Sequence, residues 1–145
     1  MQALILKLIG LFERIPADLI ALIARISIGT TFFRSGLLKI EGWNDGTTLA
    51  LFTEEYQLPV IPPELAAYMA TAAEVTLPLL LFAGLFTRFA ALGMLIMTLV
   101  IEIFVYPNAF DTHGIWAVCL LFLMQYGPGR LSLDHLAARH FAPQA

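Results

Sequence analysis

Four long apolar stretches divide the chain, and proline, glycine or charged residues separate each stretch from the next. A bilayer core about 30 Å thick requires about 20 apolar residues in each helix that crosses it. The stretches that reach or approach this length cover residues 19–38, 64–83, 87–106 and 112–126. The fourth is short, so we expect it to be less tilted than the others or to begin a few residues earlier. The pattern predicts an all-α integral membrane protein, a four-helix bundle.

Three flanking segments have the spacing of short interfacial amphipathic helices. Residues 1–16 repeat apolar side chains at helical intervals with charged residues between them, which suits a helix lying on the membrane surface. Residues 44–57 are predicted to form a helix in the loop between the first two spans. Residues 130–145 form a predicted cytoplasmic tail that contains a short helix. We expect residues 1–145 to be a single membrane domain.

Composition supports a membrane protein and excludes several other classes. The chain is 59% hydrophobic and only 13% charged, whereas soluble domains are about 25% charged. Its mean hydropathy is +0.82. A net charge of −3 argues against nucleic acid as a partner, because nucleic-acid binding requires a basic face. The single cysteine, Cys119, excludes an internal disulfide and an intramolecular dithiol redox pair.

The distribution of lysine and arginine predicts the orientation of the chain. Five basic residues fall on one side of the membrane if there are four spans, namely Lys7, Arg14, Arg88, Arg130 and Arg139. The opposite side has one basic residue, Lys39, among several acidic ones. Since positive loops stay in the cytoplasm, both termini are predicted to be cytoplasmic. A three-span arrangement would divide the basic residues between the two sides.

Five ionisable side chains are predicted to lie inside the spans. They are Arg25 and Arg34 in the first span, Glu74 in the second, Glu102 in the third and His113 at the start of the fourth. Two arginines cost about 5–7 kcal/mol on insertion, whereas an apolar residue returns about 0.3–0.6 kcal/mol. The first span is therefore marginal alone. It needs partners within the bundle, or arginines that snorkel to an interface.

Depth in the membrane suggests which of these side chains meet. At 1.5 Å per residue, Arg34 and Glu102 each lie about 22 Å from the cytoplasmic face. His113 enters at a similar level, and Glu74 lies near the midplane. We expect one polar network of Arg34 with Glu102 and Glu74, open toward the outer side through His113 and Lys39.

The helical wheel of the first span adds a second face. One stripe contains Arg25, Gly29, Phe32, Gly36 and Lys39, and its glycines permit close approach of another helix. Arg34 lies roughly opposite Arg25 on this wheel. The alternative to a functional site is a set of structural salt bridges that fix helix pairing, and for Arg25 the two readings stay equally open.

Several kinds of site are excluded by what the spans lack. Bis-histidine haem ligation requires a second histidine at the depth of His113, and a di-iron bundle site draws on about four carboxylates. No metal site is therefore expected, and no catalytic residue is assigned. An anion or quinone headgroup site, a proton path and a docking surface remain as alternatives.

Several short motifs resemble the DoxX family of small bacterial membrane proteins, and the likeness extends from about residue 25 to residue 134. The motifs are FRSGLLK at 33–39, AAE at 72–74, GLFTRFAAL at 84–92, YP at 106–107 and THGIWA at 112–117. The resemblance implies a four-helix protein of the bacterial inner (plasma) membrane. It also implies family-typical polar positions at Arg34, Lys39, Glu74, Arg88, Glu102 and His113.

The family is named for a subunit linked to thiosulfate:quinone oxidoreduction and terminal quinol oxidase complexes, so the resemblance suggests a membrane subunit or accessory of a quinone-linked redox system. Arg34 and Lys39 would donate hydrogen bonds, Glu74 and Glu102 would accept protons, and His113 would act as the shuttle. No intrinsic cofactor is expected, and a quinone is the candidate ligand. A redox partner protein would hold the electron-transfer centre, so an accessory is favoured over a stand-alone enzyme.

Two alternatives remain beside this hypothesis. The first is a non-enzymatic scaffold or assembly protein in the lipid bilayer, which recruits partners or self-associates as a homo-oligomer. The second is a small transporter, which would have to dimerise to make room for alternating access.

Overall fold

A computed structural model describes residues 2–141, apart from the side chain of Ala3, and this part of the chain consists of helices joined by turns. In chain order the elements are α1 (Gln2–Phe12), α2 (Ala17–Gly42), α3 (Thr47–Ala50), the π-helical segment η1 (Leu51–Glu55), α4 (Pro63–Ala83), α5 (Thr87–Val100), the π-helical segment η2 (Ile101–Val105), α6 (Phe110–Tyr126) and α7 (Leu133–Phe141). Residues 142–145 of the predicted tail lie outside the described part.

Three helices are long and apolar enough to cross a membrane: α2, α4 and the continuous helix Thr87–Val105 formed by α5 and η2. Within residues 2–141 the predicted all-α fold is confirmed, and these three helices correspond to three of the four predicted spans. The fourth predicted span corresponds to α6, which begins two residues earlier than predicted and has 17 residues. Helix α6 is shorter than those three helices. It nevertheless packs against both α5 and α2.

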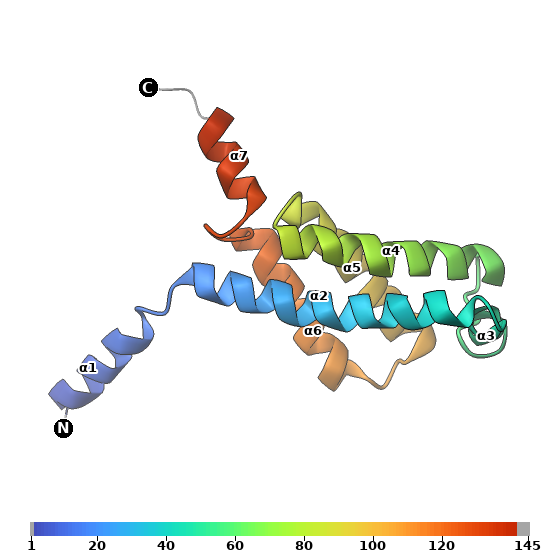
Figure 1. The fold of residues 1–145 in the computed structure, drawn as a ribbon. Coiled ribbons are helices and arrows are strands. Elements are labelled where there is room, and N and C mark those ends of the chain that lie inside the picture. Colours follow the sequence, from blue (N-terminus) through green and yellow to red (C-terminus); the bar gives the residue numbers. More distant parts are fainter. Residues whose placement is uncertain (1, 142–145) are drawn as a thin grey trace.

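The long helices form one packed unit, here called the helical body: α2, α4, α5 with η2, and α6. Figure 1 shows α2 and α4 side by side and running in opposite directions. Helix α5 packs on α4, and α6 closes the arrangement between α5 and α2. The core between these helices is apolar and contains Ala21, Ile28, Phe32, Leu81, Met94, Leu120 and Leu123.

Proline and glycine set the limits of the helices. Helix α2 begins directly after Pro16, and α4 begins with Pro63, at a position where the missing N–H of proline has no intrahelical partner to lose. Helix α4 ends at Ala83, and the next residue, Gly84, has a φ of 65°, a left-handed conformation that glycine adopts without steric cost. Helix α2, at Ala17–Gly42, extends beyond the predicted range 19–38 at both ends.

The glycine stripe of α2 faces the rest of the helical body, as the wheel predicts. Arg25, Gly29, Phe32, Gly36 and Lys39 are all buried. A Cβ atom built on Gly36 would lie 2.9 Å from the backbone carbonyl carbon of Glu74, so glycine is required for this approach of α2 to α4. This contact brings Lys39 and Glu74 to the same level of the helical body.

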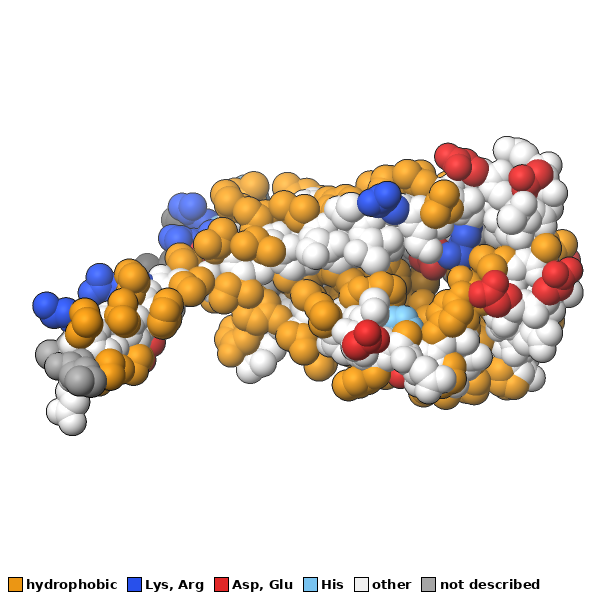
Figure 2. Space-filling model, turned by 90° about the horizontal axis from the view of Figure 1, so that it is seen from below, with side chains coloured by type: hydrophobic (Ala, Val, Ile, Leu, Met, Phe, Trp, Pro, Cys, Tyr) orange, Lys and Arg blue, Asp and Glu red, His pale blue; other side chains and the backbone are white. Residues whose placement is uncertain are grey.

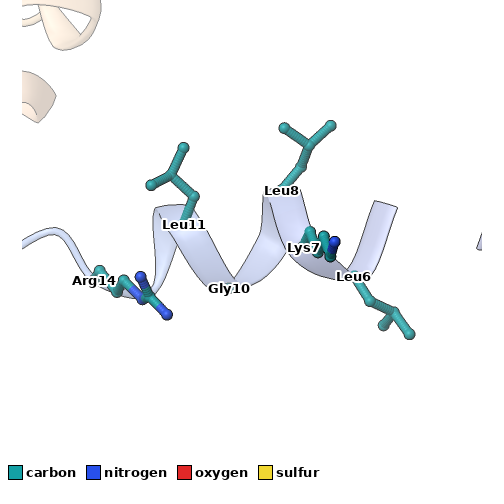
Figure 3. A pocket seen from close by; sticks show the side chains of 6 residues that line it. All are labelled: Leu6, Lys7, Leu8, Gly10, Leu11 and Arg14. Atoms are coloured by element: carbon teal, nitrogen blue, oxygen red, sulfur yellow. The ribbon is translucent and has the colours of Figure 1, made fainter. Parts of the chain in front are cut away.

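Helices α1 and α7 leave the helical body at the same end, whereas α3 and η1 cover the opposite end (Figure 1). Helix α1 projects away, and Figure 3 shows Leu8 and Leu11 on one side of it and Leu6 on the other. Helix α7 is attached at its start, because the Asp134 carboxylate accepts hydrogen bonds from the backbone N–H groups of Phe86 (2.8 Å) and Thr87 (3.0 Å).

Charged side chains divide between the two ends. In Figure 2, lysine and arginine side chains gather mainly around α1 and the adjoining end of the helical body, and acidic side chains gather at the opposite end. At that acidic end the hydrogen bonds from Thr47 hold the pKa of the Asp45 carboxyl below its ordinary value. The separation of charge predicted from the sequence is present along the long axis of the protein.

Candidate functional site

A buried ion pair joins α2 to α4 near the acidic end. Lys39 Nζ lies 2.7 Å from Glu74 Oε2, and the two side chains are 7% and 6% exposed. Lys39 Nζ also donates a hydrogen bond to Ser35 Oγ at 2.9 Å, one helical turn earlier on α2. A buried charge is stable only when it is paired and hydrogen-bonded, and both conditions are met here.

A second polar pair joins α6 to η2. His113 Nδ1 lies 2.5 Å from Glu102 Oε2, and the side chains are 6% and 20% exposed. An ionised carboxylate only accepts hydrogen bonds, so with Glu102 ionised the proton is on Nδ1 and Nε2 is free for another partner. The His113 ring also packs against Trp116, with ring centroids 4.9 Å apart.

Two π-helical turns flank this region and end in tyrosines that meet. The backbone N–H of Tyr106 donates to the carbonyl of Ile101 at 2.8 Å, and that of Tyr56 donates to Leu51 at 2.9 Å, both five residues apart. The two tyrosine rings pack edge to face with centroids 5.8 Å apart. Tyr106 also donates its hydroxyl hydrogen to Glu55. Such turns rotate the residues that follow them and are frequent at functional sites, and η2 carries Glu102.

A cavity of about 390 Å³ lies between these groups. Its polar lining comes from Ser35, Lys39, Glu74 and His113, with the rings of Tyr56, Tyr106 and Trp116. The remainder is apolar and includes Phe52, Leu58, Ile61, Ala66, Ala70, Ala73, Met97, Val100, Ile101 and Val105. An apolar cavity of this size with a few convergent polar groups has the form of a small-molecule site. Here the polar groups stand on different helices: the Lys39–Glu74 pair on α2 and α4, and His113 on α6.

The cavity reaches the surface of the helical body between α4 and α5. Met69 of α4 and Ile96 of α5 both line it, and they are 55% and 54% exposed. Because these two helices are long and apolar enough to cross a membrane, this opening lies on an apolar flank of the protein.

The predicted network centred on Arg34 is not the one found. Arg34 is exposed on the surface of α2. Glu74 pairs with Lys39, and Glu102 pairs with His113. The physical reason is rotation about the helix axis: Arg34 has the right depth, but it lies away from the buried stripe that carries Lys39. Lys39, expected at the mouth of the network, is instead one of its buried members.

The other two predicted polar residues hold helix ends together. Arg25 is buried and donates four hydrogen bonds to backbone carbonyls, those of Leu81 (2.6 Å), Phe82 (2.7 Å), Pro128 (3.0 Å) and Leu131 (2.8 Å). Arg88 donates to the carbonyls of Met124 (3.0 Å) and Gln125 (3.4 Å) at the end of α6. Cations are favourable where the last carbonyls of a helix are exposed. Both arginines lie away from the cavity.

Within residues 2–141, the structure contains no cluster of three or more histidine, cysteine, aspartate or glutamate side chains that could hold a metal ion. Sequence reasoning missed the contributions of Ser35, Tyr56 and Trp116 to the cavity. Ser35 had a detectable signal, since it precedes Lys39 by one helical turn. The tyrosines had none, because their meeting depends on both π-helical turns.

The structure thus defines a small helical membrane protein with two polar side-chain pairs beside a cavity that opens onto an apolar flank. The family model of DoxX matches residues 20–107, and the chain belongs to this family. The match includes Lys39, Glu74 and Glu102 and ends before His113. A protein of Haemophilus influenzae, described as an uncharacterized protein, is 33% identical over 125 residues, which cover 79% of this chain and 81% of that protein. No solved structure matches the chain.

Proposed function

We propose that this DoxX protein binds a quinone-like ligand in the cavity of the helical body, as a subunit or accessory of a quinone-linked redox system. The observation that carries the proposal is the cavity itself, whose largely apolar lining includes the polar side chains of Lys39, Glu74 and His113. Glu102 lies outside the lining and is the partner of His113. A quinone is a flat apolar ring with two carbonyl acceptors, so it requires donors at separated positions and an apolar enclosure.

The two polar pairs have the chemistry that quinone reduction requires. Reduction of a quinone to a quinol takes up two electrons and two protons. Lys39 Nζ would donate to one carbonyl oxygen, and His113, with its imidazole protonated, would donate through Nε2 to the other. After both protons have passed to the quinol, Glu74 and Glu102 would take up protons from water and pass them to Lys39 and His113. The electrons would come from a redox centre on a partner protein.

The opening beside Met69 and Ile96 supports a ligand that dissolves in the membrane. Both side chains are apolar and lie on membrane-crossing helices. A ligand that enters there passes from lipid to cavity without crossing water. This route favours a quinone with an apolar tail over a water-soluble anion.

The proposal includes four spans in the bacterial inner membrane with both termini in the cytoplasm. Helix α6 has 17 residues and is about 26 Å long at 1.5 Å per residue, close to the thickness of a bilayer core. The basic residues at the end where α1 and α7 emerge favour the cytoplasm for that end. Helix α1 would then lie on the membrane surface.

Tryptophan fluorescence offers a direct test, because quinones quench it on contact and Trp116 lines the cavity. The purified protein in detergent is titrated with a short-chain ubiquinone analogue. We expect saturable quenching that disappears in Trp116→Phe. His113→Leu should weaken binding about tenfold, because it removes one hydrogen bond to the ligand. Arg34→Gln, on the exposed face of α2, is the matched control and should bind normally.

Quenching that does not saturate, or that is equal in wild type and His113→Leu, would contradict the proposal. In that case a scaffold role gains support if a stoichiometric partner purifies with the protein in mild detergent and stays bound to the His113→Leu variant.

A further inference from the structure

A groove lies at the basic end of the protein, away from the cavity described above. It is bounded by the start of α2, the turn after α6, and α7, and its volume is about 530 Å³. Both apolar and basic side chains line it. Its lining residues include the apolar Leu19, Leu22 and Leu136 and the basic Arg130, His135 and Arg139.

Hydrogen bonds to the body of the protein hold the walls of this groove in place. Arg25 donates to the carbonyls of Pro128 and Leu131, which fixes the turn after α6 on α2. The backbone N–H of Arg130 donates to Asp18 Oδ1 at 3.0 Å. The Asp134 carboxylate ties α7 to the start of α5. These hydrogen bonds fix the turn after α6 and the start of α7, the helix that carries His135 and Arg139.

The charges that line the groove leave an excess of positive charge. Asp18 is its acidic member, and this carboxylate is already paired with the Arg130 side chain. Within residues 2–141, no carboxylate lies within ion-pair distance of Arg139. The half-buried ring of His135 stands beside these groups. An anion is the occupant that would balance Arg139.

The position of the groove selects the kind of anion. Helix α2 is long and apolar enough to cross the membrane, and Leu19, 48% exposed, lies in its first turn. Figure 1 shows α7 running across the axis of the helical body rather than along it. The groove thus lies where the apolar flank of α2 ends and the basic end of the protein begins, which is the level of lipid headgroups.

We infer that this groove binds an anionic glycerophospholipid. The headgroup phosphate would lie against Arg139 and His135, and an acyl chain would run along Leu19 and Leu22 into the bilayer. Basic pockets at the ends of membrane-crossing helices bind anionic lipid headgroups through this combination of charge and apolar surface.

Native mass spectrometry of the full-length protein released from detergent measures bound lipid directly. Phosphatidylglycerol should be retained in preference to phosphatidylcholine with matched acyl chains, because the phosphatidylcholine headgroup has no net charge. Arg139→Gln should lower the retained phosphatidylglycerol about fivefold, the effect of one basic residue near an anionic surface. Arg139→Lys should retain most of it. Arg14→Gln is the matched control, because it removes a cation from the same end but outside the groove.

Three results would overturn the inference. They are equal retention of the two lipids, an equal loss in Arg14→Gln and Arg139→Gln, and displacement of phosphatidylglycerol by millimolar inorganic phosphate. The last would show that the groove takes a free anion. Arg139 is exposed and within the described structure has no ion-pair partner, so its replacement should leave the fold intact, and thermal unfolding of each variant checks this.

Discussion

At the scale of single residues, the Lys39–Glu74 pair is a point where one substitution should be costly. Both side chains are almost fully buried. Removing a charge from water costs several kcal/mol, and its partner repays this only while the pair is complete. Each member of the pair therefore stabilises the protein chiefly by compensating the other.

Lys39→Met should destabilise the protein by about 3–5 kcal/mol, because it leaves the Glu74 carboxylate buried without a counter-charge. The double variant Lys39→Met with Glu74→Leu should recover most of this loss. Unfolding in detergent, followed by circular dichroism against denaturant, measures both. Arg34→Gln is the control, with an expected change within about 0.5 kcal/mol. If the double variant is as unstable as Lys39→Met, the ion pair gives the fold net stability beyond the cost of leaving Glu74 without a counter-charge.

Arg25 acts differently, since its four partners are backbone carbonyls at the ends of two segments. Arg25→Lys keeps the charge but replaces a planar group with five donors by a single ammonium. At least one buried carbonyl should lose its donor, at a cost of about 1–3 kcal/mol. The midpoint of thermal unfolding should fall accordingly. An unchanged midpoint in Arg25→Lys would mean that charge alone is sufficient at this position.

At the scale of elements, α2 and α4 approach each other closely, and both contribute lining residues to the cavity. Gly36 is a point of close approach, where a side chain would meet the backbone of α4. The same contact sets Lys39 beside Glu74. The distance between the two helices and the integrity of the ion pair are therefore coupled.

Gly36→Ala should destabilise the protein by about 1–3 kcal/mol, the usual cost of overpacking, and should weaken quinone binding in the same sample. Gly10→Ala is the matched control, because a Cβ on Gly10 would have no atom within 4 Å. Glycine in a helix is less stable than alanine by about 0.5–1 kcal/mol, so this control should be neutral or slightly stabilising. Equal effects of the two substitutions on unfolding would contradict a close contact at Gly36.

At the scale of the whole molecule, the proposed topology places the two ends of the helical body on opposite sides of the membrane. Asn108 and Ala138 are both exposed, one before α6 and one within α7. In a Cys119→Ala background, a membrane-impermeant maleimide should label Asn108→Cys in intact spheroplasts. It should label Ala138→Cys only after permeabilisation. Labelling of both from the same side would exclude a fourth span through α6.

The helices themselves were predictable because they depend on the summed hydrophobicity of consecutive residues. Apolar length sets which segments enter a membrane, and proline and glycine set where they stop. The separation of basic from acidic ends follows from the order of the segments. The buried stripe of α2 also follows from sequence, since the helical period fixes which residues share a face.

The partners of the buried charges were decided by the tertiary structure. Depth along the membrane matched Arg34 to Glu102, but a pair also requires both side chains to face each other, which depends on the rotation of each helix. The wheel placed Lys39 on the buried face and Arg34 away from it, and the close packing at Gly36 then brought Lys39 to Glu74. The π-helical turn that carries Glu102 has no signature in the hydrophobic pattern. Sequence by itself determined which segments are long and apolar helices and which face of α2 is buried, because those are local and additive properties. The ion pairs and the cavity exist only once the helices pack, because they depend on distances between segments far apart in the chain.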